Sequence, residues 1–348
     1  MFYIHQTSCI SPQQTFSGNG IDGLNELVDN KLKVIEPSYE GIPPNVLRRM
    51  GKAVRIGVGA AMPVLRTSAE PPDGIIIGTS NGGMEDCINF LNQIIDYDEG
   101  MLTPTNFVQS TPNAIASQLG FLSKNKGYNI THVHRGLSFE NAVIDAAMQL
   151  KEKPGNNYLL GGVDEISTYN YNIEWLGGWY KKELSSNKDL YTPPSAGSIA
   201  GEGAAMFLVN NKSADALARL QAIHILQATD ESLVSEQLKQ FLRANLQPGE
   251  KIDLFLSGEN GDSRLLKYYI SCEAVLDGDI TIARFKHMSG EFPTSSAIAL
   301  WLACNLLNQN HLPQHMLKTG QLKKEPAKIL VYNNYKGLQH SFMLVDKL

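Results

Sequence analysis

Two histidines and a serine lie close together near the middle of the chain, within residues 132–138. In an extended strand, His132 and His134 would point to the same face. With Glu259 or Glu291 nearby they could bind a metal ion, but we favour hydrogen bonding at a subunit interface. Ser138 could act as a nucleophile only beside a base, and His134 is the local candidate for that base. A hydrolase or acyltransferase that uses this pair is therefore one alternative for the activity.

The thiol groups give little indication of chemistry. The chain has four cysteines, which lie far apart and form no Cys-x-x-Cys pair: Cys9, Cys87, Cys272 and Cys304. This spacing predicts neither a disulfide framework nor a zinc site. We expect each cysteine to be a small buried hydrophobic residue, and we expect no metal and no cofactor.

Short apolar runs alternate with segments of helical periodicity, a pattern that indicates an α/β protein. Strands are predicted at 74–80, 157–163, 204–210, 252–258, 328–333 and 341–345. Helices are predicted at 45–65, 114–119, 139–151, 232–245, 265–276 and 295–307. The polar segment 210–219 is the best place to divide the chain, which gives two halves, 1–212 and 213–348. Each half contains a strand, a glycine turn and a helix, so a duplicated architecture is expected.

Charge and hydropathy exclude several classes of function. The net charge of −5 over 348 residues disfavours a nucleic-acid-binding protein, which would need a basic surface. No apolar run approaches the roughly 20 residues that a membrane span requires. The N-terminal residues 1–5 lack a basic segment followed by an apolar stretch, so no signal peptide is predicted. The expected location is the cytoplasm.

Five segments, in order along the chain, resemble β-ketoacyl synthases: residues 47–61, 77–83, 102–114, 160–165 and 201–209. The strongest match is the last, Gly201-Glu-Gly-Ala-Ala-Met-Phe-Leu-Val. The resemblance implies a thiolase-like, five-layered α-β-α-β-α fold of two pseudo-duplicated halves, with the active site between them. It also implies a dimer whose interface lies beside the nucleophile strand.

The position of the family's catalytic cysteine is occupied by glycine. In the family this cysteine opens a helix, whose N-terminus stabilises the thiolate and the oxyanion. Residues 131–146 resemble that turn and helix, with Gly136 at the nucleophile position and Ser138 at a family serine two residues later. Because glycine has no side chain, this position cannot accept an acyl group.

The two catalytic histidines of the family are also missing. The segment 286–297 resembles the family's Lys-x-x-x-Gly-His motif and keeps Lys286 and Gly290, but it has Glu291 in place of the histidine. A carboxylate would repel the enolate that forms during condensation. His287 lies too early to replace it, and we expect a surface or capping role for His287. The other histidine motif aligns with residues 256–262, where Ser257 takes the histidine position. No member of the catalytic triad is therefore intact.

Other positions follow from the same resemblance. It places Phe107, Asn113, Ser138 and His134 in the substrate-binding region. Residues 335–340 replace the family's glycine-rich gate, which must be flexible to close over an acyl chain.

Two basic pairs and an aromatic segment could contact other molecules. Lys181-Lys182 and Arg48-Arg49 could contact an acidic acyl carrier protein. The aromatic segment 175–180 is either a packed loop or a partner-binding or tunnel-lining region.

A kept scaffold without its catalytic residues resembles a chain-length factor, the inactive partner of a ketosynthase in type II polyketide, aryl polyene or flexirubin-like systems. The expected function is therefore a non-catalytic subunit of a synthase that elongates malonyl units on acyl carrier protein. The expected partners are acyl carrier protein and an active ketosynthase. Two alternatives remain open: an enzyme with relocated chemistry, and a homodimer that binds acyl chains or acyl carrier protein.

Overall fold

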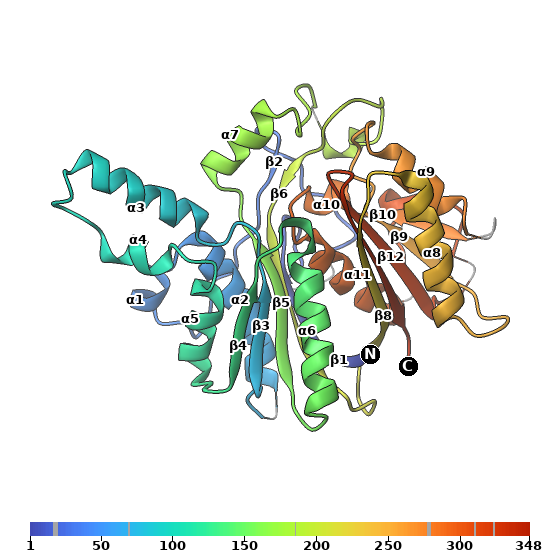
Figure 1. The fold of residues 1–348 in the computed structure, drawn as a ribbon, viewed down its shortest axis with the longest axis horizontal. Coiled ribbons are helices and arrows are strands. Elements are labelled where there is room, and N and C mark those ends of the chain that lie inside the picture. Colours follow the sequence, from blue (N-terminus) through green and yellow to red (C-terminus); the bar gives the residue numbers. More distant parts are fainter. Residues whose placement is uncertain (17–19, 69, 185, 277–279, 310, 323) are drawn as a thin grey trace.

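The computed structural model describes residues 1–348 except 17–19, 69, 185, 277–279, 310 and 323. Within this described part, eleven strands form one strongly bent sheet, and two short strands form a separate pair (Figure 1). The large sheet has the order β11-β10-β9-β12-β13-β8-β1-β7-β5-β3-β4. Its strands are β1 (Phe2–Ile10), β3 (Gly74–Gly78), β4 (Tyr128–His132), β5 (Tyr158–Asp164), β7 (Gly203–Asn210), β8 (Ala218–Gln227), β9 (Leu254–Ser257), β10 (Thr281–Arg284), β11 (Leu317–Thr319), β12 (Lys328–Tyr335) and β13 (Gln339–Asp346).

The two halves of this sheet repeat one topology. In the first half β4, β3 and β5 are parallel to one another, and β5 pairs with β7 and β7 with β1 in antiparallel fashion. In the second half β10, β9 and β12 are parallel, and β12 pairs with β13 and β13 with β8 in antiparallel fashion. The half-sheets meet where β1 pairs with β8. The fold therefore consists of two pseudo-duplicated halves, as the sequence predicts.

Helices cover the outer faces of the bent sheet and fill the space between its halves. The central layer contains α6 (Ser138–Glu152) and α11 (Ser295–Gln309), which contact strands of both half-sheets. The outer layers contain α2 (Lys52–Thr67) and α5 (Ala114–Ser123) on the first half, and α8 (Glu231–Asn245) and α9 (Leu266–Glu273) on the second. These layers give the thiolase-like α-β-α-β-α fold.

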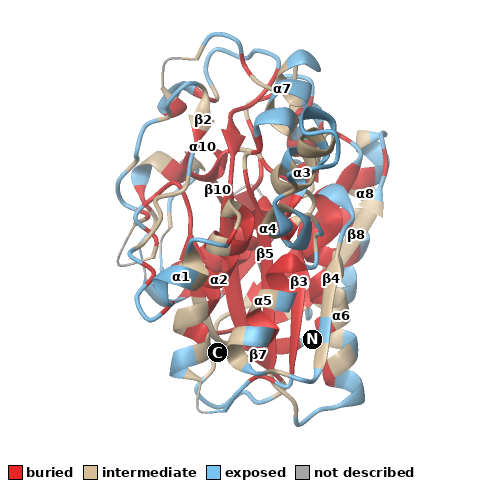
Figure 2. Cartoon of the chain, turned by 90° about the vertical axis from the view of Figure 1, so that its left-hand side faces the viewer, coloured by how far each residue is buried: buried red, intermediate tan, exposed pale blue. Residues whose placement is uncertain are grey.

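The central strands are buried, and exposed residues lie on the outer helices and loops (Figure 2). The largest apolar cluster joins α6 and α11 to the inner faces of both half-sheets. One further cluster lies under α2 and α5, and another lies under α8 and α9. In α11 most side chains are buried, because this helix has sheet on both sides. The continuous apolar run at 295–307 is the sequence signal for such a buried central helix.

Every predicted strand and helix corresponds to an observed one, but one helix is interrupted. The sequence predicts a single helix over 45–65, whereas the structure has α1 (Pro44–Leu47) and then α2 from Lys52. The helix α2 has Gly51 at its N-cap, and Pro44 opens α1, so local residue types explain the break. The prediction did not include the hairpin of α3 (Met84–Asp96) and α4 (Pro104–Gln109), which projects from the body (Figure 1), or α7 (Thr168–Leu176).

We propose that the boundary between the halves lies at residues 212 and 213, in the connection between β7 and β8. In the described residues no helix is long and apolar enough to cross a membrane.

Candidate functional site

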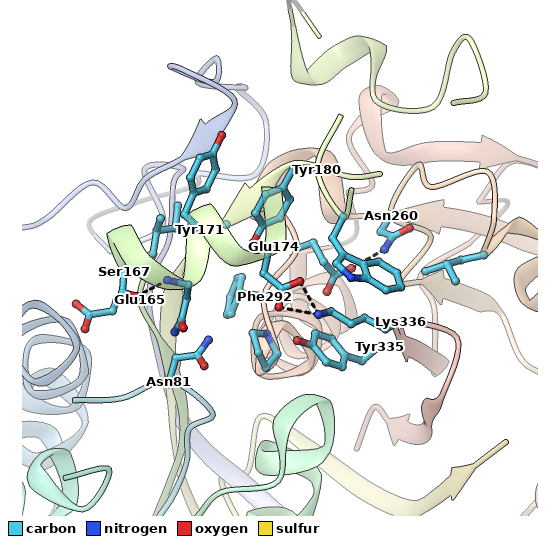
Figure 3. A pocket seen from close by; sticks show the side chains of 17 residues that line it. Asn81, Glu165, Ser167, Tyr171, Glu174, Tyr180, Asn260, Phe292, Tyr335 and Lys336 are labelled. Atoms are coloured by element: carbon cyan, nitrogen blue, oxygen red, sulfur yellow. Dashed lines mark hydrogen bonds and ion pairs between the residues drawn. The ribbon is translucent and has the colours of Figure 1, made fainter. Parts of the chain in front are cut away.

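The positions that the sequence assigns to catalysis meet at one end of the strands, between the two halves. Gly136 lies in the short η1 helix (Arg135–Leu137) between β4 and α6. Ser257 ends β9, and Lys286 opens the short helix α10 (Lys286–Ser289), which follows β10. In parallel strands of one half-sheet, these ends lie at the same edge, which is where α/β proteins usually place their sites. A cavity of about 50 Å³ lies at this edge, and Figure 3 shows its lining residues.

The space at the nucleophile position is filled by the side chain of Tyr335. A Cβ atom added to Gly136 would lie 2.2 Å from Tyr335 Cβ and 2.4 Å from its Cγ. The Gly136 N–H donates a hydrogen bond to Gln339 Oε1 at 2.9 Å. The resemblance to β-ketoacyl synthases implies that the helix N-terminus stabilises an oxyanion here, whereas in this chain a side chain of the same molecule accepts the hydrogen bond from this N–H. Neither a thiolate nor a substrate oxyanion has room at this position.

The buried lysine of the second motif is neutralised by the residue that replaces histidine. Lys286 is fully buried, and its Nζ lies 2.9 Å from Glu291 Oε1 and 2.5 Å from Ser295 Oγ. The other carboxylate oxygen of Glu291 accepts a hydrogen bond from Asn260 Nδ2 at 2.9 Å. Burial lowers the pKa of Lys286, and the charge of Glu291 opposes this shift. The geometry is that of a structural ion pair rather than a donor to an enolate.

A second carboxyl group is buried in the central layer near this pair. Glu140 on α6 is fully buried and accepts a hydrogen bond from Ser341 Oγ at 2.7 Å. Burial raises the pKa of Glu140 to about 7. At neutral pH this site is therefore partly protonated, which reduces the negative charge close to Lys286.

Ser257, at the position of the other histidine, is also engaged in local structure. Its side chain is fully buried, and its Oγ accepts a hydrogen bond from the backbone N–H of Glu259 at 3.2 Å. Asp262, farther along the same loop, forms an ion pair with Arg264. These contacts stabilise the turn after β9 and bring no imidazole to the site.

Glycines allow the two halves to approach each other beside Glu291. A Cβ atom on Gly201 would lie 2.1 Å from the carbonyl oxygen of Ser289, and one on Gly290 would lie 2.5 Å from Gly201 Cα. Gly290 also has φ of +71°, which favours glycine. At this contact the Gly201 N–H donates a hydrogen bond to the Glu291 carbonyl, and the Glu291 N–H donates one to the Ile199 carbonyl. The two glycine motifs of the sequence thus have a packing role.

Two carboxylates near the strand ends, Asp164 and Glu202, have hydrogen-bond partners within the chain. Asp164 at the end of β5 accepts hydrogen bonds from the backbone N–H groups of Ser80 and Asn81 in the first half and from Thr294 in the second. Glu202 accepts hydrogen bonds from the backbone N–H groups of Val34 and Ile166 and forms an ion pair with Lys52. Both carboxylates therefore hold loops around the site in place.

The structure does not bring Ser138 and His134 together as a nucleophile and its base. Ser138 is fully buried; its Oγ donates to the Arg135 carbonyl at 2.8 Å and accepts from the backbone N–H of His134 at 2.7 Å. The imidazole of His134 instead interacts with Asn141 through Nδ1. The Ser138 side chain thus stabilises the turn at residues 134–138 that precedes α6, and its hydroxyl forms no hydrogen bond with the imidazole of His134.

The histidine pair does not form a metal site in the described residues. His132 Nε2 pairs with Asp145 on α6 at 2.9 Å, away from the His134 contact. Glu259 pairs with Arg284 and Lys318, and Glu291 pairs with Lys286. Across the described chain, no cluster of three or more His, Cys, Asp or Glu side chains could hold an ion.

Two predicted substrate-binding residues lie on the outside of this chain. Phe107 on α4 is 61% exposed and packs against Phe90 with 5.3 Å between ring centroids. Asn113 is also exposed; its Oδ1 accepts a hydrogen bond from Thr131 and its Nδ2 donates to Ser117. Neither lines the cavity beside Tyr335.

Of the predicted carrier-protein contacts, one lysine is unavailable. Lys181 is buried, and its Nζ donates to Ser195 and to the carbonyl oxygen of Gly261. Lys182, Arg48 and Arg49 are exposed. Lys181 therefore stabilises a loop rather than meeting a partner.

The expectation that His287 is a surface or capping residue is wrong. His287 is buried, and its Nε2 contacts His315 Nδ1 at 2.9 Å while its Nδ1 contacts Tyr191 at 3.2 Å. His315 Nε2 in turn donates to the Ile21 carbonyl at 2.8 Å. Burial first, and then the neighbouring His315 and Arg284, lower the pKa of His287 to about 3. The sequence gives no local sign of this chain of contacts, because its members are far apart along the chain.

This buried histidine predicts a loss of stability in mild acid. Below pH 6.5 the unfolded chain protonates this histidine, whereas folded His287 stays neutral until about pH 3, so its contribution to stability decreases as pH falls through this window. Buried Glu140 has the opposite effect on stability. Because its pKa is raised to about 7 in the folded state, its contribution to stability decreases as pH rises above 4.5. The measurement is therefore a comparison: urea unfolding between pH 7 and 5 for wild type and His287→Gln. We expect the free energy of unfolding to decrease less with falling pH in the variant than in wild type. An equal pH dependence in both proteins would contradict the lowered pKa of His287.

The cavity itself is lined mainly by residues that the sequence did not assign to the site. Its walls include aromatic and acidic side chains from both halves, shown in Figure 3: Tyr171, Glu174, Trp179, Tyr180, Glu291, Phe292 and Tyr335. Trp179 belongs to the aromatic segment that the sequence singled out. A volume of about 50 Å³ holds a few water molecules and no acyl chain.

Known families and solved structures with similar sequences or folds include β-ketoacyl synthases. Residues 27–174 match the family described as "Beta-ketoacyl synthase, N-terminal domain". No curated protein matches the sequence. Among solved structures, a β-ketoacyl synthase from Burkholderia phymatum STM815 superposes with a TM-score of 0.79 at 14% identity, covering 100% of this chain and 99% of the other.

Chain-length-factor complexes are also among the similar structures. "The ishigamide ketosynthase/chain length factor" has a TM-score of 0.74 at 16% identity, covering 100% of this chain and 99% of the other. The Xenorhabdus doucetiae ketosynthase ApeO in complex with its chain length factor ApeC has a TM-score of 0.75 at 13% identity, covering 100% and 98%. The chain therefore has the ketosynthase fold over its whole length, and its residues 27–174 are similar to a β-ketoacyl synthase N-terminal domain.

Proposed function

We propose that this chain is a non-catalytic β-ketoacyl synthase homologue that acts as the chain-length-factor-like partner of an active ketosynthase. The observation that carries the proposal is the nucleophile position: Gly136 has no side chain, and Tyr335 fills the space that an acylated cysteine would need. The replacements Ser257 and Glu291 support it, because both side chains have structural partners. The partner enzyme would supply all of the condensation chemistry.

The proposed pathway is the elongation of malonyl units on acyl carrier protein, in type II polyketide, aryl polyene (flexirubin-like) or fatty acid biosynthesis in the cytoplasm. Solved relatives of this fold include complexes with a chain length factor and with an acyl-carrier protein. The cavity beside Tyr335 is too small for a growing acyl chain, which supports a tunnel that lies largely in the partner.

We propose that the partner binds at β4 and the α3–α4 hairpin. The strand β4 is the last described strand at one end of the sheet, and an uncovered edge can pair with another chain. Large apolar side chains are exposed on the adjacent hairpin: Leu91, Ile95, Met101, Phe107 and Val108. Exposed apolar surface of this kind marks protein interfaces. At such an interface Phe107 and Asn113 could contact the partner and its bound acyl chain.

The activity test is co-expression with an intact ketosynthase from the same genome. We expect a one-to-one complex on size-exclusion chromatography and malonyl elongation on acyl carrier protein only when both chains are present. The exposed His134 allows a clean control: His134→Ala and a folded Ser138→Ala variant should elongate as well as wild type. A homodimer that ignores the synthase, or elongation that depends on either side chain, would contradict the proposal.

The interface predicts a specific loss of assembly. Phe107→Arg is expected to weaken the complex by about 100-fold, because it places a charge in the apolar centre of the interface. Leu233→Arg, on exposed α8 of the other half, should leave affinity unchanged. Titration calorimetry or analytical ultracentrifugation of the purified chains measures both. Equal affinity for wild type and Phe107→Arg would place the interface elsewhere.

A further inference from the structure

The side chain of Lys336 lies among groups that commonly bind organic ammonium ions. Its Nζ lies 2.6 Å from Glu174 Oε1 and 2.5 Å from Glu174 Oε2. The same nitrogen lies 4.8 Å from the centroid of the Trp179 ring and 5.4 Å from that of Tyr335. A carboxylate together with aromatic ring faces is the arrangement by which proteins recognise ammonium groups.

These groups come from opposite halves of the fold. Glu174 belongs to α7, and Trp179 follows it, whereas Lys336 lies in the turn between β12 and β13. Figure 3 shows Glu174 joined to Lys336 beside Tyr335, at the wall of the cavity. The contact therefore connects α7 to the turn that covers Gly136.

The backbone conformation of the turn at Lys336 is unusual for a lysine. Lys336 has φ of +56°, in the left-handed region that glycine, asparagine and aspartate adopt most readily. The backbone there is fixed by hydrogen bonds from Gly337 N–H to Asn334 Oδ1 and from Leu338 N–H to the Tyr335 carbonyl. A lysine at this position has an unfavourable backbone conformation, so its side-chain contacts are what stabilise it here.

The aromatic wall is itself held in position. The guanidinium of Arg264 lies 4.6 Å from the Trp179 ring centroid, and its Nη2 donates to the Gly178 carbonyl at 2.9 Å. Asp262 binds the same guanidinium through both carboxylate oxygens. The Trp179 side of the site is therefore held in place by partners other than Lys336.

We propose that Glu174, Trp179 and Tyr335 form a binding site for a primary alkylammonium group, which the chain fills with its own Lys336. By binding Glu174, Lys336 fixes the β12–β13 turn against α7 and so keeps Tyr335 over Gly136. A free alkylammonium ion is the ligand class that the site accepts once the lysine is removed. The inference concerns this chain alone and does not depend on its being a chain-length-factor-like subunit.

Chemical rescue tests the site directly. Lys336→Asn removes the ammonium and suits the left-handed backbone. We expect amide hydrogen exchange at Gly337 and Leu338 to become roughly tenfold faster in this variant. Propylammonium chloride at millimolar concentration should slow the exchange again and alter the tryptophan fluorescence. Propanol and potassium chloride at the same concentrations should do neither. Glu174→Gln in the Lys336→Asn background should abolish the rescue.

Matched variants separate this site from an ordinary surface ion pair. Lys336→Arg keeps a cation and should retain slow exchange, and Trp179→Phe should remove the fluorescence response. Lys347→Ala, which breaks the exposed pair with Glu325, should leave the turn unchanged. Unchanged exchange in Lys336→Asn, or equal rescue by propanol and propylammonium, would overturn the proposal.

Discussion

Replacing Gly136 with cysteine is expected to destabilise the protein by about 3 kcal/mol rather than to restore an active nucleophile. The new Cβ would lie 2.2 Å from Tyr335 Cβ, which is far too close for two carbon atoms that are not bonded to each other. Because the position of Tyr335 Cβ is set by the β12 backbone, rotation of the tyrosine ring cannot relieve the clash. The backbone of η1 or β12 would have to move instead.

Chemical denaturation of Gly136→Cys and three further variants measures this loss of stability. Gly136→Ala should lose as much stability as Gly136→Cys, because the clash involves Cβ alone. The double variant Gly136→Cys/Tyr335→Gly should recover part of the loss, whereas Gly155→Ala, where a Cβ would meet nothing within 4 Å, serves as the control. Nearly unchanged stability of Gly136→Ala would show that this space is open.

Removing the Glu291 carboxylate is expected to cost about 3 kcal/mol, because it leaves the buried ammonium of Lys286 without its ion-pair partner. Lys286 has no exposure to water, and Ser295 alone cannot compensate its charge. The variant Glu291→Ala should therefore unfold at a markedly lower denaturant concentration than wild type.

A double variant without either charge separates the effect of the unpaired charge from the effect of lost packing. Lys286→Met/Glu291→Gln removes both charges and should be more stable than Glu291→Ala alone. The exposed pair of Lys347 and Glu325 provides the comparison, since Glu325→Ala should change stability by at most about 1 kcal/mol. If Glu291→Ala were as stable as the surface variant, the pair would contribute little.

Much of the architecture could be predicted because it depends on local patterns. The apolar runs at 74–80 and 157–163 are fully buried strands, and the helical periodicities correspond to α6, α8 and α11. Other elements were not predicted. The edge strand β4 is only partly buried and has no strong apolar signal, whereas α3 is amphipathic but has no buried residues in this chain. Their arrangement depends on the sheet they join.

The sequence also located the candidate site but not its contents. Gly136, Ser257 and Glu291 were identified from the order of the motifs, and the structure places the loops that carry them at one edge of the sheet. The contacts of Tyr335, Gln339 and Lys336 were not predictable, because their partners lie 162 or more residues away along the chain. No periodicity or spacing rule reports contacts at such a separation.

By itself, the sequence determined the α/β class and the duplicated order of elements, and it predicts that a cysteine and two histidines are missing at the catalytic positions. These properties follow from residue types and short-range spacing. Only the tertiary structure decided that Tyr335 fills the space at Gly136, that Glu291 pairs with Lys286, and that the Ser138 hydroxyl bonds to backbone groups of the preceding turn and not to an imidazole. Each of these depends on which side chains from distant segments compete for the same buried space, and packing settles that competition only once both halves have folded together.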